Sequence, residues 1–196
     1  MSIGPNSFLV AAATVAGLGA WFDFRSARKP AEGEGTEGEI PNWLTLGALV
    51  LAPLGYFAWG AARGGVRGGA VSFGLSLLGA VVCGLVPLLL YRYEMGGGGD
   101  VKLLAAIGAL CQPMIGIEAE FYAFAAAALF APAWLAWEGR LFRTLANSLW
   151  LAVNPFLPKA KRREIKRETL TWFRLGPAIF AGTLIAVVLH WRPEGP

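Results

Sequence analysis

Long apolar runs recur along the whole chain and limit the folds that it can adopt. Six runs of roughly 16 to 25 mostly apolar residues are each long enough to cross the hydrocarbon of a membrane. Inside hydrocarbon every backbone N–H and C=O must be satisfied internally, which a helix achieves within one segment. The sequence therefore predicts an all-α, polytopic integral membrane protein whose spans cover residues 7–22, 42–62, 69–91, 101–117, 119–137 and 173–191. The fourth run is short and is interrupted by a proline.

The composition favours a single membrane-embedded domain over residues 1–196. Hydrophobic residues make up 56% of the chain and charged residues 15%, a balance unlike that of a soluble globular domain. The run at 7–22 has no basic residue before it, so we expect a retained span and not a signal peptide. Cys83 and Cys111 lack the paired spacing of a zinc site, and we expect no metal and no other cofactor.

Basic residues are divided unequally between the segments that link the predicted spans. Fourteen of the 17 Lys and Arg residues fall on one side of the membrane, whereas Arg63, Arg67 and Arg192 fall on the other. An excess of this kind marks cytoplasmic loops. We therefore expect both termini outside, and the loops after the first, third and fifth spans in the cytoplasm. The net charge of +4 follows from this bias and does not indicate a nucleic-acid partner.

Two of the predicted cytoplasmic loops differ in composition. Residues 23–41 are rich in Gly, Glu and Pro without apolar periodicity, which is typical of a flexible loop. Residues 138–171 carry apolar side chains at helical spacing, followed by the basic stretch KAKRREIKR. This pattern predicts an amphipathic interfacial helix whose basic residues are drawn to anionic lipid. A loop that only sets the topology is the alternative interpretation.

The sequence contains only two aspartates, and the predicted topology places both at the cytoplasmic boundary. Asp23 follows the first span and Asp100 precedes the fourth. An ordinary helix-end acid with access to water is one interpretation of each. As a pair they form a candidate aspartic dyad, because two adjacent carboxyl groups share one proton. The ionised member can then deprotonate water while the protonated member polarises a peptide carbonyl.

The segment EMGGGGDVKLL sets the second aspartate among glycines. Gly97 and Gly99 have no side chains, so the backbone before Asp100 can take a positive φ and another backbone can approach closely. A flexible hinge between helices is the alternative, and the pattern of a phosphate-binding P-loop is absent. Because the helix macrodipole favours an anion at the N-terminus, we expect Asp100 to be the ionised base and Asp23 to hold the proton.

This segment resembles the signature of the type IV prepilin peptidases, a family within the GxGD class of membrane aspartic proteases. The GxGD pattern falls on Gly97, Gly99 and Asp100, and Lys102 matches a lysine that commonly follows. Lys102 is expected either to orient the substrate or to extend to the membrane surface as a snorkelling lysine.

Two further stretches are similar to motifs of the same family. Asp23 and Arg25 resemble the first aspartate with its following arginine, and the stretch IPN, which contains Pro41 and Asn42, resembles the motif that comes next. The acidic stretch at 31–39 looks like an insertion between them. The late stretch RLGPAIFAG resembles a Gly-Pro-Ala segment of the final span.

The resemblance implies a membrane endopeptidase in which Asp23 and Asp100 are the catalytic pair. Its substrate would be a pilin-like precursor whose short basic leader is cut before a hydrophobic helix, at the cytoplasmic face of a bacterial inner membrane. The bifunctional members carry a further domain with two Cys-x-x-Cys pairs, and nothing in this sequence resembles it. We therefore expect cleavage without N-methylation, as in short members linked to Flp-type or tight-adherence pili.

Two other classes of function are weighed against the peptidase. A proton-coupled transporter uses intramembrane acids along a path across the bilayer, whereas the two aspartates gather at one boundary and no inverted repeat is evident. A non-catalytic scaffold of a secretion or pilus apparatus gives no reason for both aspartates in these settings. His190, at the end of the last span, is expected to have an interfacial role. The sequence indicates no particular oligomeric state.

Overall fold

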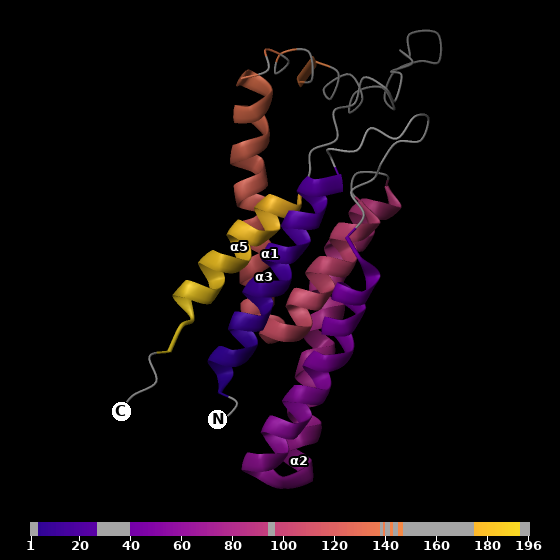
Figure 1. Ribbon diagram of the computed structural model, residues 1–196, viewed down its shortest axis with the longest axis vertical. Coiled ribbons are helices and arrows are strands. Elements are labelled where there is room, and N and C mark those ends of the chain that lie inside the picture. The colour runs from indigo at the N-terminus through magenta and orange to yellow at the C-terminus, as the bar shows by residue number, and fades with distance from the viewer. Residues whose placement is uncertain are drawn as a thin grey trace, which may run out of the picture. The chain divides into compact units, whose positions relative to one another are not determined.

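The computed structural model describes residues 4–26, 40–93, 97–137 and 175–192, together with residues 139, 142, 145 and 146. The named elements in these residues are all helices: α1 (Pro5–Ser26), α2 (Asn42–Arg92), α3 (Gly98–Trp137) and α5 (Gly176–Leu189). The described part of the chain is therefore all-α, as the apolar runs predict (Figure 1).

The chain divides into two compact units. The first consists of Met1–Ala126 with Arg174–Pro196 and contains α1, α2, most of α3 and α5. The second is Ala127–Phe173, whose described part is mainly the end of α3. Apart from four isolated positions, the predicted interfacial helix at 138–171 lies outside the described residues.

α2 consists of two helical segments joined by a tight turn. Gly64 and Gly65 have non-helical backbone angles, and Gly65 has a φ of 62°, which residues with a side chain rarely adopt. The segments 42–63 and 66–92 fold back on each other (Figure 1), and they approach so closely that Gly60 has no room for a side chain. The turn falls in the glycine-rich stretch between the second and third predicted spans.

α3 also changes direction, at Gln112. This residue has a φ of 61° and a ψ of 173°, a region that is almost confined to glycine. Pro113 follows it and disfavours helical angles in the preceding residue. The run predicted to span 101–117, which Pro113 interrupts, is therefore not one continuous helix but breaks at Gln112. The first segment, 98–111, is about 21 Å long at 1.5 Å per residue, shorter than a hydrocarbon core of about 30 Å.

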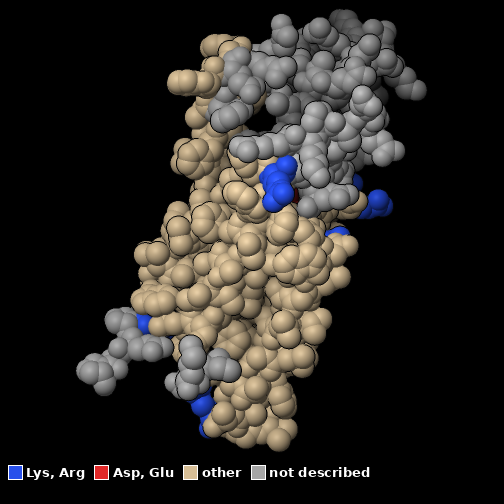
Figure 2. Space-filling model, in the orientation of Figure 1, with Lys and Arg blue, Asp and Glu red and all other residues tan. Residues whose placement is uncertain are grey.

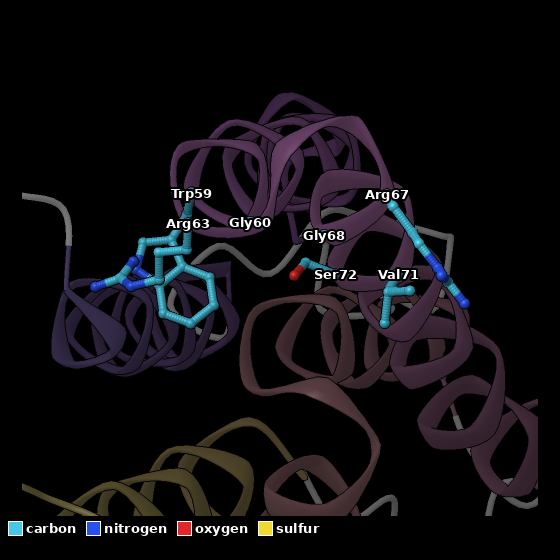
Figure 3. Close-up of a pocket in the computed structure, with 8 residues that line it drawn as sticks. Trp59, Gly60, Arg63, Arg67, Gly68, Val71 and Ser72 are labelled. Carbon is cyan, nitrogen blue, oxygen red and sulfur yellow. The ribbon is translucent and has the colours of Figure 1, made fainter.

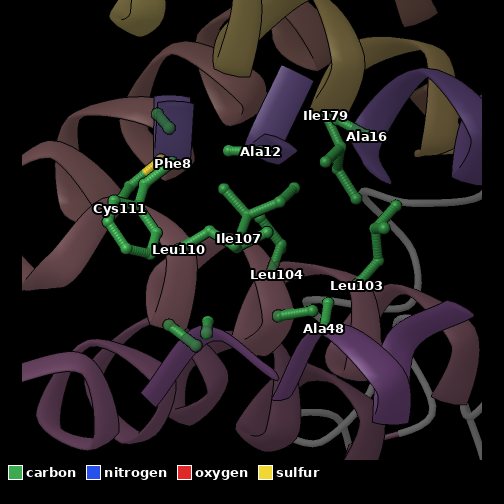
Figure 4. Packing of buried hydrophobic residues seen from close by; sticks show 14 of the residues in the cluster. Phe8, Ala12, Ala16, Ala48, Leu103, Leu104, Ile107, Leu110, Cys111 and Ile179 are labelled. Carbon is green, nitrogen blue, oxygen red and sulfur yellow. The ribbon is translucent and has the colours of Figure 1, made fainter. Parts of the chain in front are cut away.

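The first segment of α3 forms the centre of the first unit. Its side chains at positions 103, 104 and 107 are at most 1% exposed. They belong to one cluster of buried residues to which α1, α2 and α5 all contribute (Figure 4), including Leu103, Leu104, Ile107, Ala12, Ala16, Ala48 and Ile179.

Small residues let the helices around this centre approach closely. A Cβ atom at Gly79 in α2 would overlap the backbone of Gly108 in α3, and the reverse is also true. Gly182 of α5 stands equally close to the backbone of Ala123 in α3. Contacts of this kind are typical of helices that associate in lipid, where packing replaces the hydrophobic effect as the driving force.

The outward faces of the helices are apolar. Within the described residues, three helices are long and apolar enough to cross a membrane by length and composition: Pro5–Arg25, Asn42–Arg92 and Gly98–Trp137. On α2, Leu51 is 69% exposed and Val81 is 66% exposed. On the face in Figure 2, basic side chains lie in groups separated by a wide band of uncharged residues. Such a surface suits contact with lipid.

Candidate active site

Asp23 lies within the last turns of α1. The helix continues to Ser26, so the prediction that the loop begins at residue 23 is wrong. Arg25, in the last turn, is exposed, and its charge suits the negative end of the helix dipole. Asp23 itself is only 6% exposed. A carboxyl group at this depth is costly in an apolar setting, which points to a specific role.

Asp100 is the third residue of α3 and is half-buried. The backbone N–H of Gly97 donates a hydrogen bond to its carboxylate, and the N–H of Asp100 donates to the carbonyl oxygen of Gly97 at 3.2 Å. An acid that reaches back to the N–H before its own helix is one half of a capping box, and it satisfies a donor that the helix cannot. A Cβ atom at Gly97 would lie 3.2 Å from Oδ2 of Asp100, so glycine leaves room for this carboxylate. Gly99 is half-buried in the same first turn.

The fold brings the two aspartates to one place. They are 77 positions apart in the sequence and come from different helices. In the fold their carboxyl groups lie close enough for the two charges to interact.

α5 begins against the side chain of Asp23. Gly176 is its first residue and is buried, and a Cβ atom there would lie 2.6 Å from Oδ2 and 3.0 Å from Cβ of Asp23. Pro177 follows. Proline is favoured in the first turn of a helix because a backbone N–H at that position has no partner within the helix, so its absence costs nothing. The positive end of the α5 dipole is therefore directed at Asp23. We expected Asp23 to hold the proton because it lies at the C-terminal, negative end of the α1 dipole, and this expectation did not include α5. With α5 in place, both aspartates lie beside a helix N-terminus.

Lys102 and Asn42 connect the starts of α3 and α2. Nζ of Lys102 donates a hydrogen bond to Oδ1 of Asn42 at 2.9 Å, on the exposed surface. Asn42 is the first residue of α2, and Pro41 precedes it with the extended angles φ −58° and ψ 130°. The rings of Phe22 and Trp43 meet edge to face with centroids 6.3 Å apart, which joins the end of α1 to the start of α2. The predicted motif residues therefore share one end of the first unit, despite the acidic insertion.

The sequence analysis did not single out two acids of α3, Glu118 and Glu120. Glu120 is 6% exposed, and its Oε1 has no hydrogen-bond partner within the described residues. Oε2 of Glu118 lies 2.7 Å from Nε2 of His190, so the expected interfacial histidine has a specific carboxylate partner. The available signal was the position of Glu120 inside the apolar run at 119–137 and of Glu118 directly before it, because ionisable residues in such a setting are rare and usually functional.

The end of the first unit that holds Asp23 and Asp100, here called the aspartate end, is suited to acid–base chemistry with access to water. A buried carboxyl group and a half-buried one lie within interaction range of each other, and exposed polar side chains stand nearby. Two coupled carboxyl groups can hold a single proton between them, which supplies a base and an acid for attack on a polar bond. Among the residues that the structure describes, no group of three or more His, Cys, Asp or Glu side chains is arranged to hold a metal ion.

Comparison with known proteins gives one match. A model of the type IV leader peptidase family matches residues 36–135, which is half of the chain. The matched range contains Asn42, Asp100 and Lys102, and it begins after Asp23, whose place in the site follows from the geometry. No curated protein and no solved structure matches the chain.

Proposed function

The chain belongs to the type IV leader peptidase family, and on that premise we propose that it is a membrane aspartic endopeptidase that cleaves type IV pilin-like precursors. The observation that carries the proposal is the approach of Asp23 to Asp100 from two different helices. In this proposal the substrate carries a short basic leader before a hydrophobic helix, as in precursors of Flp-type or tight-adherence pili.

The proposed reaction is hydrolysis of one peptide bond by the aspartate pair. The ionised carboxylate takes a proton from a bound water, and the water oxygen attacks the carbonyl carbon of the peptide. The protonated carboxyl group meanwhile donates a hydrogen bond to the carbonyl oxygen, where negative charge develops. The C–N bond then breaks as a proton passes to the leaving nitrogen, which yields a free leader and a new N-terminus.

The surroundings of the pair suit an extended substrate. Gly97 has no side chain and so leaves space beside the carboxylate of Asp100, where a substrate backbone can approach. The exposed Lys102 and Asn42, joined by their hydrogen bond, stand where the substrate would enter from the membrane surface. We place this end at the cytoplasmic face of a bacterial inner membrane, with six spans and both termini outside, because the basic residues are biased in that way. The basic loop at 138–171 would contact anionic lipid at the same face.

Co-expression with a candidate precursor tests the proposal. The wild-type chain should convert the precursor to a shorter product on a gel, whereas Asp23→Asn and Asp100→Asn should leave it uncut. Equal amounts of each variant in the membrane fraction provide the control for insertion. Processing that persists in both variants contradicts an aspartate mechanism.

A proton-coupled transporter is the second candidate, and the buried Glu120 is the observation that favours it. An acid with a buried carboxyl oxygen that is unpaired within the described residues is suited to carry a proton. Purified protein in liposomes with an internal pH-sensitive dye separates the two functions. Proton uptake that disappears in Glu120→Gln, together with no precursor cleavage, would support the transporter. Cleavage without proton uptake would support the peptidase.

A further inference from the structure

A second polar region lies at the opposite end of α1 from Asp23. Asn6 and Asp23 are seventeen residues apart on this helix, which corresponds to about 26 Å along its axis. A cavity of about 370 Å³ lies there, between the start of α1, the first segment of α2, the break in α3 and the end of α5. The peptidase mechanism uses none of the residues that line it.

Two arginines line this cavity, and neither forms an ion pair within the described residues. The guanidinium of Arg63 lies over the ring of Trp59, with Cζ 4.1 Å from the ring centroid. Arg192 is held through its backbone: Nδ2 of Asn6 donates to its carbonyl oxygen at 2.6 Å, and its N–H donates to Oδ1 of Asn6 at 3.4 Å. Because Asn6 is buried, the chain that carries Arg192 is fixed at the edge of the cavity.

Trp59 adds a hydrogen-bond donor that lacks an acceptor. Its Nε1 atom is buried and has no partner in the part of the chain that the structure describes, although buried indole N–H groups usually find one. The ring is held in place by Arg63 and by Tyr56, which meets it edge to face with centroids 6.3 Å apart. The Tyr56 hydroxyl donates to the carbonyl oxygen of Leu110 at 2.8 Å. The lining therefore includes a fixed indole ring beside a cation, and the N–H of this indole is unpaired within the described residues.

Negative charge is scarce around the cavity. Among the described residues that line it there is no Asp or Glu, and the nearby Glu118 is paired with His190, which does line it. Gln112, the residue with the glycine-like backbone angles, also lines the cavity and contributes an amide. Strained backbone of this kind is concentrated at functional sites. Two arginines, an indole N–H and amides without a lining carboxylate favour an anionic ligand.

We propose that this cavity binds the phosphate group of an anionic phospholipid, in the leaflet opposite the aspartates. Arginine matches the oxygens of a phosphate with two parallel hydrogen bonds, and an indole suits the depth of the headgroups. The neighbouring surface is apolar enough for acyl chains: Val188 is 65% exposed and Leu189 is 61% exposed at the end of α5. A free phosphate would use the same donors without this apolar surface, so the experiment must separate the two sources.

Arg67 provides a matched control for Arg63. It lines a second cavity of about 430 Å³ at the turn of α2, which shares Trp59 and Arg63 with the first, and it is not among the described residues that line the proposed site. Figure 3 shows Arg63 beside Trp59 and Arg67 directed away from both. Replacing Arg67 removes the same charge from the same turn without touching the proposed site.

Native mass spectrometry of the full chain in detergent measures the binding directly. Phosphatidylglycerol, phosphatidylcholine and inorganic phosphate are titrated separately. Wild type and Arg67→Gln should retain phosphatidylglycerol equally, and the double variant Arg63→Gln/Arg192→Gln should bind it at least about tenfold more weakly, since the loss of a single charge-assisted hydrogen bond already gives that factor. Trp59→Phe, which keeps a ring but removes the N–H, should weaken binding by a smaller factor. Trp191→Phe, outside the lining, should leave it unchanged.

The competing outcomes are distinct. Equal retention of phosphatidylglycerol by wild type and the double variant overturns the proposal, and so does equal retention of phosphatidylcholine and phosphatidylglycerol by the wild type. Inorganic phosphate that binds as tightly as the lipid, and is lost in the same double variant, assigns the site to free phosphate and overturns the lipid. If the double variant fails to fold, phosphatidylglycerol binding by Trp59→Phe is compared with binding by Trp191→Phe. Weaker binding by Trp59→Phe supports the proposal, and equal binding overturns it. Peptidase activity is not the readout, so the outcome is independent of the proposed cleavage.

Discussion

The two ends of the first unit both gather polar side chains, but they are built differently. At the aspartate end, Gly97, Asp100 and Lys102 come from one short stretch, with Asn42 from another. At the cavity end, the polar residues come from the start of α1, the end of the first segment of α2, the break in α3 and the residues that follow α5. A reacting group needs fixed neighbours along one turn of backbone, which leaves a motif in the sequence. A binding cavity between helix ends needs only suitable side chains at the right depth, which leaves none.

The largest expected effect separates the aspartates from the other buried acid. Asp23→Asn and Asp100→Asn should each lower the cleavage rate by at least about 100-fold, because each removes a group that transfers a proton. Glu120→Gln, at the same 6% exposure as Asp23, should leave the rate within a few-fold. A quantitative precursor-cleavage assay in liposomes measures all three. An equal loss in Glu120→Gln would show that any buried acid in this unit is needed, and the distinction between the aspartates and other acids would disappear.

The second effect tests the contact of α5 with Asp23. Gly176→Ala places a methyl group into the Asp23 carboxylate, and we expect a loss of about 10- to 100-fold in cleavage, the effect of a misplaced catalytic group. Gly47→Ala is the matched control, because a Cβ atom there meets nothing within 4 Å. Circular dichroism of both variants monitors folding. Full activity in a folded Gly176→Ala variant would mean that the position of Asp23 tolerates displacement.

A smaller effect is expected for the link between α2 and α3. Lys102→Met and Asn42→Ala should each reduce cleavage by a few-fold, because their hydrogen bond is exposed. The double variant should lose little more than either single variant, with a coupling energy of about 0.5–1.5 kcal/mol. Fully additive losses in the cleavage assay would show that the two residues act separately.

The smallest effect on activity is expected at the cavity end. Asn6→Ala removes two hydrogen bonds to the backbone of Arg192 and should lower the free energy of unfolding by about 1–2 kcal/mol. The cleavage rate of the folded protein should stay unchanged. Ser7→Ala, at an exposed neighbouring position, should alter neither property. A loss of cleavage in folded Asn6→Ala would couple the two ends of the unit.

Local features were predicted best where one segment determines its own structure. The apolar runs located α1, both segments of α2 and α5 to within a few residues. The exception is the predicted span at 101–117, where the steric conflict at Pro113 breaks the helix early. The extent of α1 was underestimated because Asp23 and Arg25 are polar and were assigned to a loop. A polar residue such as Asp23 can remain helical when it is buried against another element.

Within the site, the sequence indicated which residues belong together but not what surrounds them. It singled out Asp23 and Asp100 by their rarity and by their motifs. It did not indicate that Gly176 would lie against Asp23 or that Lys102 would bond to Asn42. Nor did it suggest that Glu118 would pair with His190, 72 positions away.

The sequence by itself determined the helical, apolar character of the protein, its family and its candidate acids. It could do so because a helix in an apolar setting satisfies its own backbone, and because a motif keeps its residues on one turn. Only the tertiary structure decided which helix ends meet, since helices in such a unit are joined by small residues whose partners are distant in the chain, as with Gly79 and Gly108. The electrostatic setting of Asp23 is the clearest consequence. Along the chain this residue lies at the negative end of α1, and the fold places the positive end of α5 against it.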